Sequence, residues 1–352
     1  MHTQKQLFIN GRFLTQRISG VQSFAREVCR ELMAQKPITI LVPANAQLID
    51  DEFANCIKRV GLFGGHLWEQ LSLPLFMAQQ KNAMLLNLCN TGPLMVNQQI
   101  VTIHDLAFLK NPSWFHPVFS KVYSFLIPQL AERSQFIITV SETIKQEIEQ
   151  KFEVDANKII VVGNKVSAQL LNSKSIEAFD ERIQPQNFFL MVGSDNPRKN
   201  FLFVEQIFSE EHVDSKLVIV GGSDKSFNNT THTENKNIIR LHYTDNSTLL
   251  WLYKNAKALI NPSLYEGFGI PNIEAMAMGC PVICSDIKVF KEVCGNAAFY
   301  FSLDKIDELK NCIAQLNERS ELTIEKIHTG KNIFEKYQHE NRVAKILKLL
   351  EA

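Results

Sequence analysis

Short runs of apolar and β-branched residues recur along the whole chain, and segments with helical spacing lie between them. Val21, Phe24, Val28 and Leu32, for example, fall on one face of a helix, whereas the short runs suit buried strands. Strands that alternate with helices indicate parallel sheets covered on both faces. The predicted strands are Leu7–Asn10, Ile38–Pro43, Ala83–Leu88, Ile100–His104, Phe136–Ser141 and Ile159–Val162, followed by Phe188–Val192, Leu217–Val220, Ile238–Leu241, Ala258–Asn261, Val282–Cys284 and Ala298–Phe301.

A polar stretch, Asn172–Asn187, divides these strands into two series and is predicted to be a linker. The expected organisation is an N-terminal domain over 1–171, the linker over 172–187, a second domain over 188–332, and a C-terminal helix over 333–352 with the option of packing back on the first domain. The predicted fold class is α/β, with two doubly wound Rossmann-like domains facing an interdomain cleft, because ligands of such sheets bind at the carboxyl ends of the strands. The polar segment Asp224–Lys236 is predicted to be a mobile loop.

Charge and cysteine usage narrow the class of protein. Among 352 residues there are 37 Lys and Arg and 37 Asp and Glu, so the formal net charge is zero and a nucleic-acid partner is not expected. The seven cysteines form no C-x-x-C pair and are interpreted as reduced residues of a cytoplasmic protein. No run approaches the ~18 apolar residues of a spanning helix, although contact with the inner membrane surface stays open.

One stretch, Asn261–Val282, has the pattern of a ligand-binding strand, loop and helix. The strand ends at Asn261, and Gly267 and Gly269 follow, so that backbone N–H groups can approach a ligand closely. Pro271 suits the first turn of the next helix. A helix N-terminus beside a glycine-rich loop favours anions through its free N–H groups and its dipole. The segment is therefore predicted to bind an anionic group.

Two glutamates flank this loop. Glu266 lies at its entrance and Glu274 about one turn into the helix, where carboxylates would accept hydrogen bonds from sugar hydroxyls. The spacing of the two glutamates, taken alone, would also fit two solvent-exposed side chains with no function. The surrounding glycines and prolines, from Asn261 to Val282, make the functional interpretation the preferred one.

The whole string resembles the E-x7-E signature of retaining GT-B glycosyltransferases of the GT4 family, and the resemblance extends over about residues 7–320. It implies that Arg198 and Lys199, which follow Gly193 and Ser194, neutralise the diphosphate of a nucleoside diphosphate sugar. Val101–Asp105 resembles the family's strand that ends in His-Asp, which places His104 near the transferred sugar. The implied catalytic residues are His104, Glu266, Lys199 and Arg198.

The implied donor-binding residues come from several loops. They are Gly20, Gly193, Ser194, Arg198, Lys199, Tyr243, Thr244, Glu266, Gly267, Phe268, Gly269, Ile270 and Glu274. Three positions depart from the family pattern. Ser194 stands where many relatives have Arg, His242 stands where they often have Gly, and Gly163–Val166 reads Gly-Asn-Lys-Val instead of containing Asn-Gly-Val. More of the phosphate charge is therefore expected to fall on Arg198 and Lys199.

The resemblance also suggests a subgroup. Leu67–Pro74, Asn90–Pro93 and the pair Ser141-Glu142 resemble the corresponding segments of bacterial enzymes of O-antigen and capsule assembly, many of which transfer mannose. A GDP- or UDP-linked donor, a saccharide or lipid-linked saccharide acceptor, retention of configuration, and no metal or other cofactor are expected. The chain has no Asp-x-Asp motif of the kind that holds a metal–nucleotide complex. The aromatic residues Trp114, Phe115, Phe119, Tyr123 and Phe125 could form a membrane-facing patch or simply a helix core.

Two other functions remain possible for the same architecture. A GT-B sugar-nucleotide epimerase would not be expected to have the full Glu266–Val282 string. A non-catalytic sugar-nucleotide-binding subunit would not be expected to keep Glu266, Glu274, Arg198, Lys199 and His104 together.

Overall fold

A computed structural model describes residues 5–174, 176, 179–209, 215–222, 235–317 and 320–351. By their internal packing the residues form two compact units. Unit 1 comprises Met1–Leu106, Lys121–Gly163 and Glu340–Ala352, and unit 2 comprises Ala107–Ser120 and Asn164–His339. These limits differ from the expected ones, since 107–120 and 164–171 group with the second unit and the chain's last residues group with the first.

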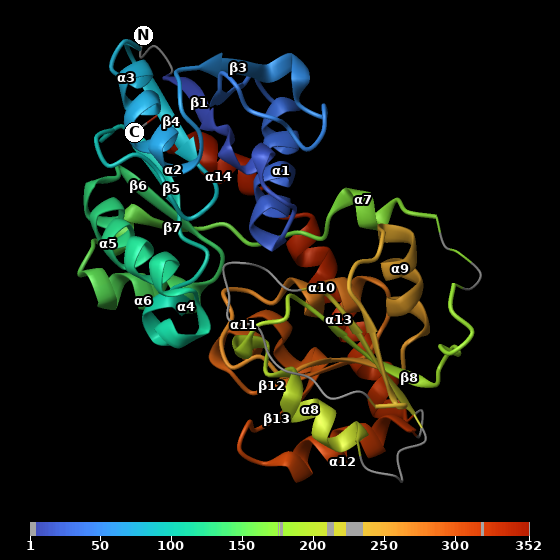
Figure 1. The fold of residues 1–352 in the computed structure, drawn as a ribbon. Helices are drawn as coiled ribbons and strands as arrows, with labels where there is room; N and C mark the ends of the chain where they lie inside the picture. The colour runs from blue at the N-terminus through green and yellow to red at the C-terminus, as the bar shows by residue number, and fades with distance from the viewer. Residues whose placement is uncertain are drawn as a thin grey trace. The chain divides into compact units, whose positions relative to one another are not determined.

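Unit 1 is built on a seven-stranded sheet in which every strand pairing is parallel (Figure 1). The strand order is β3-β2-β1-β4-β5-β6-β7, so the order reverses between β1 and β4. The strands are β1 (Gln6–Asn10), β2 (Thr39–Pro43), β3 (Ile57–Val60), β4 (Ala83–Asn87), β5 (Gln99–Thr102), β6 (Phe136–Thr139) and β7 (Ile159–Val161). The α-helices and the π-helix of 20–152 are α1 (Gly20–Met33), α2 (Gly65–Leu67), the π-helix η3 (Trp68–Ser72), α3 (Leu73–Met77), α4 (Ala107–Lys110), α5 (Pro117–Arg133) and α6 (Glu142–Phe152), of which α4 and the start of α5 group with unit 2.

Unit 2 repeats this plan with a six-stranded parallel sheet of order β10-β9-β8-β11-β12-β13. Here the order reverses between β8 and β11. The strands are β8 (Phe188–Val192), β9 (Lys216–Val220), β10 (Ile238–Leu241), β11 (Ala258–Asn261), β12 (Val282–Ser285) and β13 (Ala298–Phe301). The α-helices are α7 (Ala168–Leu171), α8 (Phe201–Phe208), α9 (Asn246–Asn255), α10 (Ile270–Ala277), α11 (Lys288–Cys294), α12 (Ile306–Asn317) and α13 (Glu321–Gln338).

Each predicted apolar run overlaps a strand to within one or two residues at either end, because these strands are covered on both faces and their side chains form the cores. In unit 2, Phe189, Met191, Leu217 and Ile260 lie in one buried cluster. The α/β prediction of two doubly wound sheets is thus confirmed. The edge strand β3 was missed, because its sequence Ile-Lys-Arg-Val exposes Lys58 and Arg59 and shows no apolar run, as is common at sheet edges.

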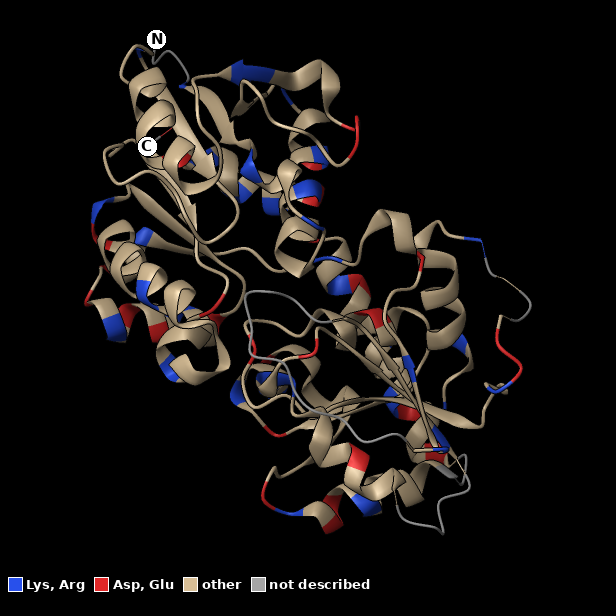
Figure 2. Ribbon diagram, viewed as in Figure 1, with Lys and Arg blue, Asp and Glu red and all other residues tan. Residues whose placement is uncertain are grey.

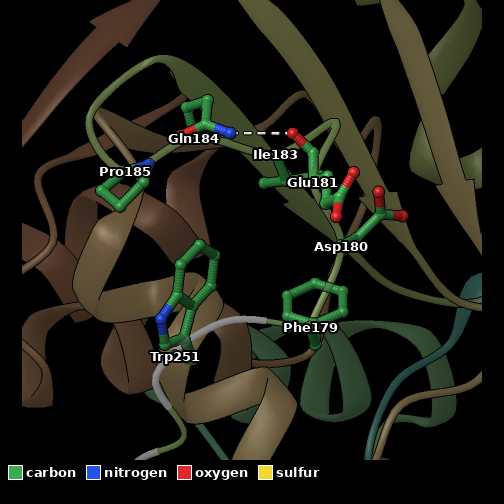
Figure 3. A pocket seen from close by; sticks show the side chains of 7 residues that line it. All are labelled: Phe179, Asp180, Glu181, Ile183, Gln184, Pro185 and Trp251. Atoms are coloured by element: carbon green, nitrogen blue, oxygen red, sulfur yellow. Dashed lines mark hydrogen bonds between the residues drawn. The ribbon is translucent and has the colours of Figure 1, made fainter.

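The described part of the expected linker packs on unit 2. The ring of Phe179 meets Trp251 of α9 edge to face at 5.4 Å, and Gln186 N donates to the carbonyl of Asn255 at 2.7 Å. A pocket of about 340 Å³ lies here, and Figure 3 shows its lining side chains, with Gln184 Nε2 donating to the carbonyl of Glu181 at 2.8 Å. None of the predicted site residues lines it. The loop expected over Asp224–Lys236 falls almost wholly outside the described residues.

The single helix expected over 333–352 is wrong. The structure has α13, which ends at Gln338, and a separate helix α14 (Arg342–Lys348) capped by the side chain of Asn341. The apolar residues of this segment pack in two different cores. Tyr337 meets Phe268 edge to face at 5.1 Å within unit 2, whereas Val343 and Ile346 of α14 are buried in unit 1.

Candidate functional site

The predicted phosphate loop and the glutamate loop leave neighbouring strands of unit 2. Residues 193–199 follow β8 and residues 262–269 follow β11, and the strand order of the sheet reverses between these two strands. Ligands of doubly wound sheets bind outside the carboxyl ends of the strands at such a reversal. The topology therefore brings the two loops to the position where a ligand is expected.

Glycines allow the first of these loops to close tightly. A Cβ on Gly193 would lie 2.9 Å from Cε of Lys199, and a Cβ on Gly221 would lie 1.7 Å from the carbonyl oxygen of Gly193. Asn196 shapes the turn that follows, because its Oδ1 accepts from Arg198 N at 3.0 Å and its Nδ2 donates to Ser194 Oγ at 2.9 Å. Ser194 thus supports the turn that presents Arg198 and Lys199.

Arg198, Lys199 and Glu266 form a cluster of two cations around one carboxylate, called here the charge triad. Arg198 Nη1 donates to Glu266 Oε2 at 2.9 Å and to the carbonyl of Tyr265 at 2.9 Å, and Lys199 Nζ donates to Glu266 Oε1. Burial by itself raises the pKa of Glu266, but the charges of Arg198 and Lys199 outweigh it and lower this pKa to about 2. The triad therefore has a net charge of +1 at neutral pH.

A layer of polar side chains that the sequence analysis missed supports the carboxylate. The hydroxyl of Ser263 lies 3.0 Å from Glu266 Oε1 and 2.8 Å from Asn261 Oδ1, and Asn261 Nδ2 donates to Asn272 Oδ1 at 2.8 Å. Ser285 Oγ donates to the carbonyl of Ser263 at 2.7 Å. All four side chains are buried. Their signal in the sequence is polar residues where an apolar strand ends.

The helix α10 begins as the glycine and proline pattern predicts. Gly269 precedes it with φ +94°, a left-handed conformation that favours glycine, and Pro271 lies in the first turn. A Cβ added to Gly269 would also lie 2.6 Å from Phe290 Cε1. Glu274 follows one turn later and accepts a hydrogen bond from Tyr253 Oη at 2.7 Å. Burial raises the pKa of Glu274, and the Tyr253 hydroxyl and Lys199 offset only part of that effect.

The remaining residues of unit 2 that were predicted to bind the donor differ in exposure. Tyr243 follows β10 and is 78% exposed, and Thr244 beside it is half-buried. Phe268 is buried against Tyr337, so only its backbone is in a position to meet a ligand. Ile270 is the first residue of α10 and is half-buried.

His104 and Gly20 belong to unit 1. His104 follows β5, its Nε2 donates to the carbonyl of Leu88 at 2.9 Å, and its backbone N donates to Asn90 Oδ1 at 2.8 Å. Burial lowers the pKa of His104, although the Leu88 carbonyl and Asp105 counteract part of the shift, so the ring is neutral at pH 7. Gly20 is exposed at the first turn of α1.

The described residues contain no group of three or more His, Cys, Asp or Glu side chains placed to hold a metal ion. Across the same described ranges, no helix combines the length and the apolar character needed to cross a membrane.

The two halves of the chain match two family models. Residues 18–170 match Glycosyltransferase Family 4, and residues 172–333 match Glycosyl transferases group 1.

The chain is also similar to mannosyltransferases. It is 34% identical over 246 residues to the O-antigen chain mannosyltransferase RfbU of Salmonella typhimurium, covering 65% of this chain and 66% of that protein. It is 26% identical to O-antigen chain mannosyltransferase B of Escherichia coli, covering 63% and 62%, and 30% identical to the serotype-specific mannosyltransferase WbdA of Escherichia coli, covering 57% and 27%. The match thus spans 66% or less of the length of each of these relatives.

Among solved structures, the fold is similar to sucrose-phosphate synthase from Thermosynechococcus elongatus, with a TM-score of 0.73 at 15% identity over 99% of this chain and 98% of that one. It is also similar to WaaG, a glycosyltransferase involved in lipopolysaccharide biosynthesis, with a TM-score of 0.68 at 12% identity over 98% and 99%. These similarities establish the GT-B fold.

Proposed function

The chain belongs to the glycosyltransferases, because its first half matches Glycosyltransferase Family 4 and its second half matches Glycosyl transferases group 1, and we propose the following reaction for it. A hexosyl group, mannosyl as the first candidate, moves from a GDP- or UDP-linked sugar to a hydroxyl of a saccharide or lipid-linked saccharide. The anomeric configuration is retained. The similarity to O-antigen mannosyltransferases supports a place in O-antigen or capsule synthesis at the cytoplasmic side of the membrane.

The charge triad at the strand reversal of unit 2 is the observation that supports this reaction most strongly. When the bond between C1 of the sugar and the β-phosphate oxygen breaks, negative charge grows on the diphosphate. The net charge of +1 and the N-terminus of α10 are fixed in place before the reaction, and preorganised charges of this kind stabilise a leaving group effectively. The departing phosphate oxygen takes the proton of the acceptor hydroxyl as the new bond to C1 forms.

Each further site residue has a role that fits its surroundings. The carboxylate of Glu266 aligns Arg198 and Lys199 and has lone pairs left to accept a sugar hydroxyl. Glu274, held by Tyr253, accepts from the ribose hydroxyls. His104 is neutral, and its Nδ1 is the nitrogen left to accept a hydrogen bond from the transferred sugar, because Nε2 donates to Leu88.

We propose that transfer requires no metal and no cofactor besides the donor. The cations of the triad would take the part that a divalent ion plays in metal-dependent enzymes. Full activity after exhaustive chelation, measured as released nucleoside diphosphate, is the expected result. Activity that disappears with EDTA and returns with Mn²⁺ or Mg²⁺ would contradict this part of the proposal.

A thermal-shift screen against UDP, GDP, ADP and dTDP sugars identifies the nucleotide, since a ligand at 100 times its Kd stabilises the native state by about 2.7 kcal/mol. Transfer is then measured with the stabilising donor in Glu266→Gln and Lys199→Met, with the exposed Lys254→Met as the matched control. Both site variants are expected to lose transfer by on the order of 10²-fold while the control keeps it. Wild-type activity in both site variants would overturn the proposed site.

The alternatives are distinguished by products. Incubation of the wild type with the donor and no acceptor is expected to give slow hydrolysis. Epimerised sugar nucleotide would indicate the epimerase instead. Donor binding with no turnover across an acceptor panel would indicate a non-catalytic subunit.

We also propose that the protein contacts an anionic membrane, but through a different surface from the aromatic segment singled out in the sequence. Of the five aromatic residues, Trp114 and Phe115 are buried, Phe119 and Tyr123 are half-buried, and Phe125 is 64% exposed, so the five do not form one exposed patch. The surface that we propose lies instead on the outward face of α2, η3 and α3 and beside that face. We call it the apolar stripe. It consists of Leu62, Phe63, Leu67, Leu71, Leu75 and Met95, which are all 47% or more exposed.

The charges near the apolar stripe fit anionic lipids. Residues 57–98 contain the cations Lys58, Arg59 and Lys81, and their one acid, Glu69, is buried. Figure 2 shows blue residues on β3, at one end of this segment. Leu75→Ser is expected to reduce pelleting with vesicles containing phosphatidylglycerol, whereas Ile324→Ser, at a position of α13 with similar exposure, is expected to leave it unchanged. Equal pelleting of both variants would contradict this surface.

A further inference from the structure

The strand reversal of the unit 1 sheet holds a buried polar network that the proposed function does not use. Strand order reverses between β1 and β4, whose last residues are Asn10 and Asn87. Asn10 Nδ2 lies 3.0 Å from Asn87 Oδ1 and 2.8 Å from Glu69 Oε1. Because such a reversal is where a doubly wound sheet binds its ligand, this network occupies the expected ligand position of unit 1.

Glu69 is an ionised carboxylate in the interior. Its side chain is 1% exposed, Arg12 Nε lies 3.6 Å away, and Thr91 Oγ1 donates to Oε1 at 3.1 Å. Burial raises its pKa, but Arg12, His66 and Asn10 together lower it below the usual value. A buried ion pair is weak evidence for stability, because its desolvation offsets most of the Coulomb attraction. A role in function is therefore a better reason for this charge.

The second carboxylate oxygen of Glu69, Oε2, pairs with His66 at the surface. Glu69 Oε2 lies 3.2 Å from Nδ1 of His66, whose side chain is 43% exposed and whose ring meets Tyr123 edge to face at 6.3 Å. None of the described residues hydrogen bonds to Nε2 of His66. A carboxylate can only accept, so it keeps the ring proton on Nδ1 and leaves the lone pair of Nε2 to face outward.

The backbone around this pair is shaped for access and for rigidity. A Cβ added to Gly64 or Gly65 would meet nothing within 4 Å, so the His66 end is open. Glu69 lies in the π-helical turn η3, and such turns are frequent at functional sites. Gln70 fixes the turn to the loop after β4, since its Nε2 donates to the carbonyl of Gly92 at 2.8 Å and its Oε1 accepts from Leu94 N at 3.0 Å.

We propose that His66 and Glu69 form a hydroxyl-binding site for the saccharide acceptor. His66 Nε2 accepts a hydrogen bond from an acceptor hydroxyl, and Glu69, charge-balanced by Arg12, is the positioning residue that sets the tautomer and direction of the ring. The proposal rests on the proposed function in that the acceptor is a saccharide. It also explains why Leu67–Pro74 and Asn90–Pro93, two separate sequence motifs, are hydrogen bonded to each other.

The kinetic test uses octyl α-D-mannopyranoside and octyl β-D-galactopyranoside as acceptors, with the donor found by thermal shift. His66→Phe is expected to raise the acceptor KM about tenfold or more, the value of one lost hydrogen bond. The donor KM and the hydrolysis of donor without acceptor should stay within about twofold of the wild type. His66→Gln, which keeps a polar group near the position of Nε2, should fall between. His328→Phe, at an exposed histidine of α13, is the matched control and should leave both KM values unchanged.

A second measurement works without turnover. In ¹⁵N-histidine spectra of the wild type, the octyl glycosides are expected to shift the His66 ring signals, and Glu69→Gln is expected to move the ring proton toward Nε2. An acceptor KM in His66→Phe equal to that of the wild type, or His66 signals that do not respond to any octyl glycoside, would overturn the inference. If the wild type turns over no donor at all, the proposed function fails, and the spectra still decide the His66 site.

Discussion

At the scale of the residue, the surroundings of Glu266 and Glu274 give two similar carboxylates opposite behaviour. Glu266 lies between two cations, which lower its pKa to about 2, whereas Glu274 accepts the Tyr253 hydroxyl, and burial raises its pKa. Neither difference can be deduced from the E-x7-E spacing, because it depends on Arg198, Lys199 and Tyr253, which lie elsewhere in the chain. The two glutamates therefore respond differently to pH and to neutralisation.

Acid is expected to weaken unit 2 through Glu266. Its folded pKa, about 2, is lower than its ordinary value of 4.5, so the charged form stabilises the native state. This contribution is fully present above about pH 4.5 and disappears as the pH falls toward 2, and it amounts to about 3 kcal/mol. Urea unfolding of wild type and Glu266→Gln should therefore differ strongly at pH 6 and much less at pH 3. A difference that is independent of pH would show that the carboxylate is not ion-paired in solution.

Neutralising Glu274 is expected to have the opposite effect. Its raised pKa means that the native state disfavours the charged form, so the carboxylate costs stability at any pH above its ordinary value. Glu274→Gln can still accept from Tyr253 and should raise the melting temperature at pH 7.5, while donor binding weakens. Tyr253→Phe is the control, because it removes the hydrogen bond and should lower stability instead. A lower melting temperature in Glu274→Gln would contradict the sign of the pKa shift.

At the scale of the element, the strand–loop–helix around Gly269 was predictable because each of its residues has one dominant conformational preference. The strand run, the glycines and Pro271 each indicated the observed β11, turn and α10. The buried side chains of Ser263, Asn261 and Asn272 were not predictable, since a polar residue at a strand end does not reveal its partner. The break between α13 and α14 was missed for a similar reason. The spacing of apolar residues does not say which core each one joins.

Gly269→Ala tests this element. A left-handed residue other than glycine costs on the order of 1–3 kcal/mol, and the new Cβ would also lie 2.6 Å from the ring of Phe290. We expect a lower melting temperature and weaker binding of the nucleoside diphosphate, because the N-terminus of α10 shifts. Gly64→Ala, where a Cβ meets open space, should change neither property. Unchanged nucleotide affinity in Gly269→Ala would show that the start of α10 does not contact the diphosphate.

At the scale of the whole molecule, the linear order of the chain does not match the division into units. The alternating strands and helices were sufficient to predict two doubly wound sheets, because that pattern is repeated locally. The limits of the units were not predictable, since the last residues, Glu340–Ala352, pack with unit 1 although they follow all of unit 2 in sequence. Arg342 of α14 is fully buried there, and its Nε donates to Glu31 Oε2 of α1 at 3.1 Å.

Truncation after His339 is therefore expected to destabilise unit 1, with which the deleted residues pack. Unit 2, which precedes them directly in sequence, should be much less affected. The truncation removes Val343, Ile346 and Leu350, each at most 1% exposed, and burial of three such side chains contributes roughly 5 kcal/mol or more. Since a domain has about 5–15 kcal/mol of net stability, unit 1 should lose most of its hydrogen-exchange protection. Strands β8 and β11 to β13 of unit 2 should stay protected. The milder Ile346→Ala should weaken the same strands of unit 1 by about 2–5 kcal/mol. Equal loss of protection in both sheets would mean that the two units unfold as one.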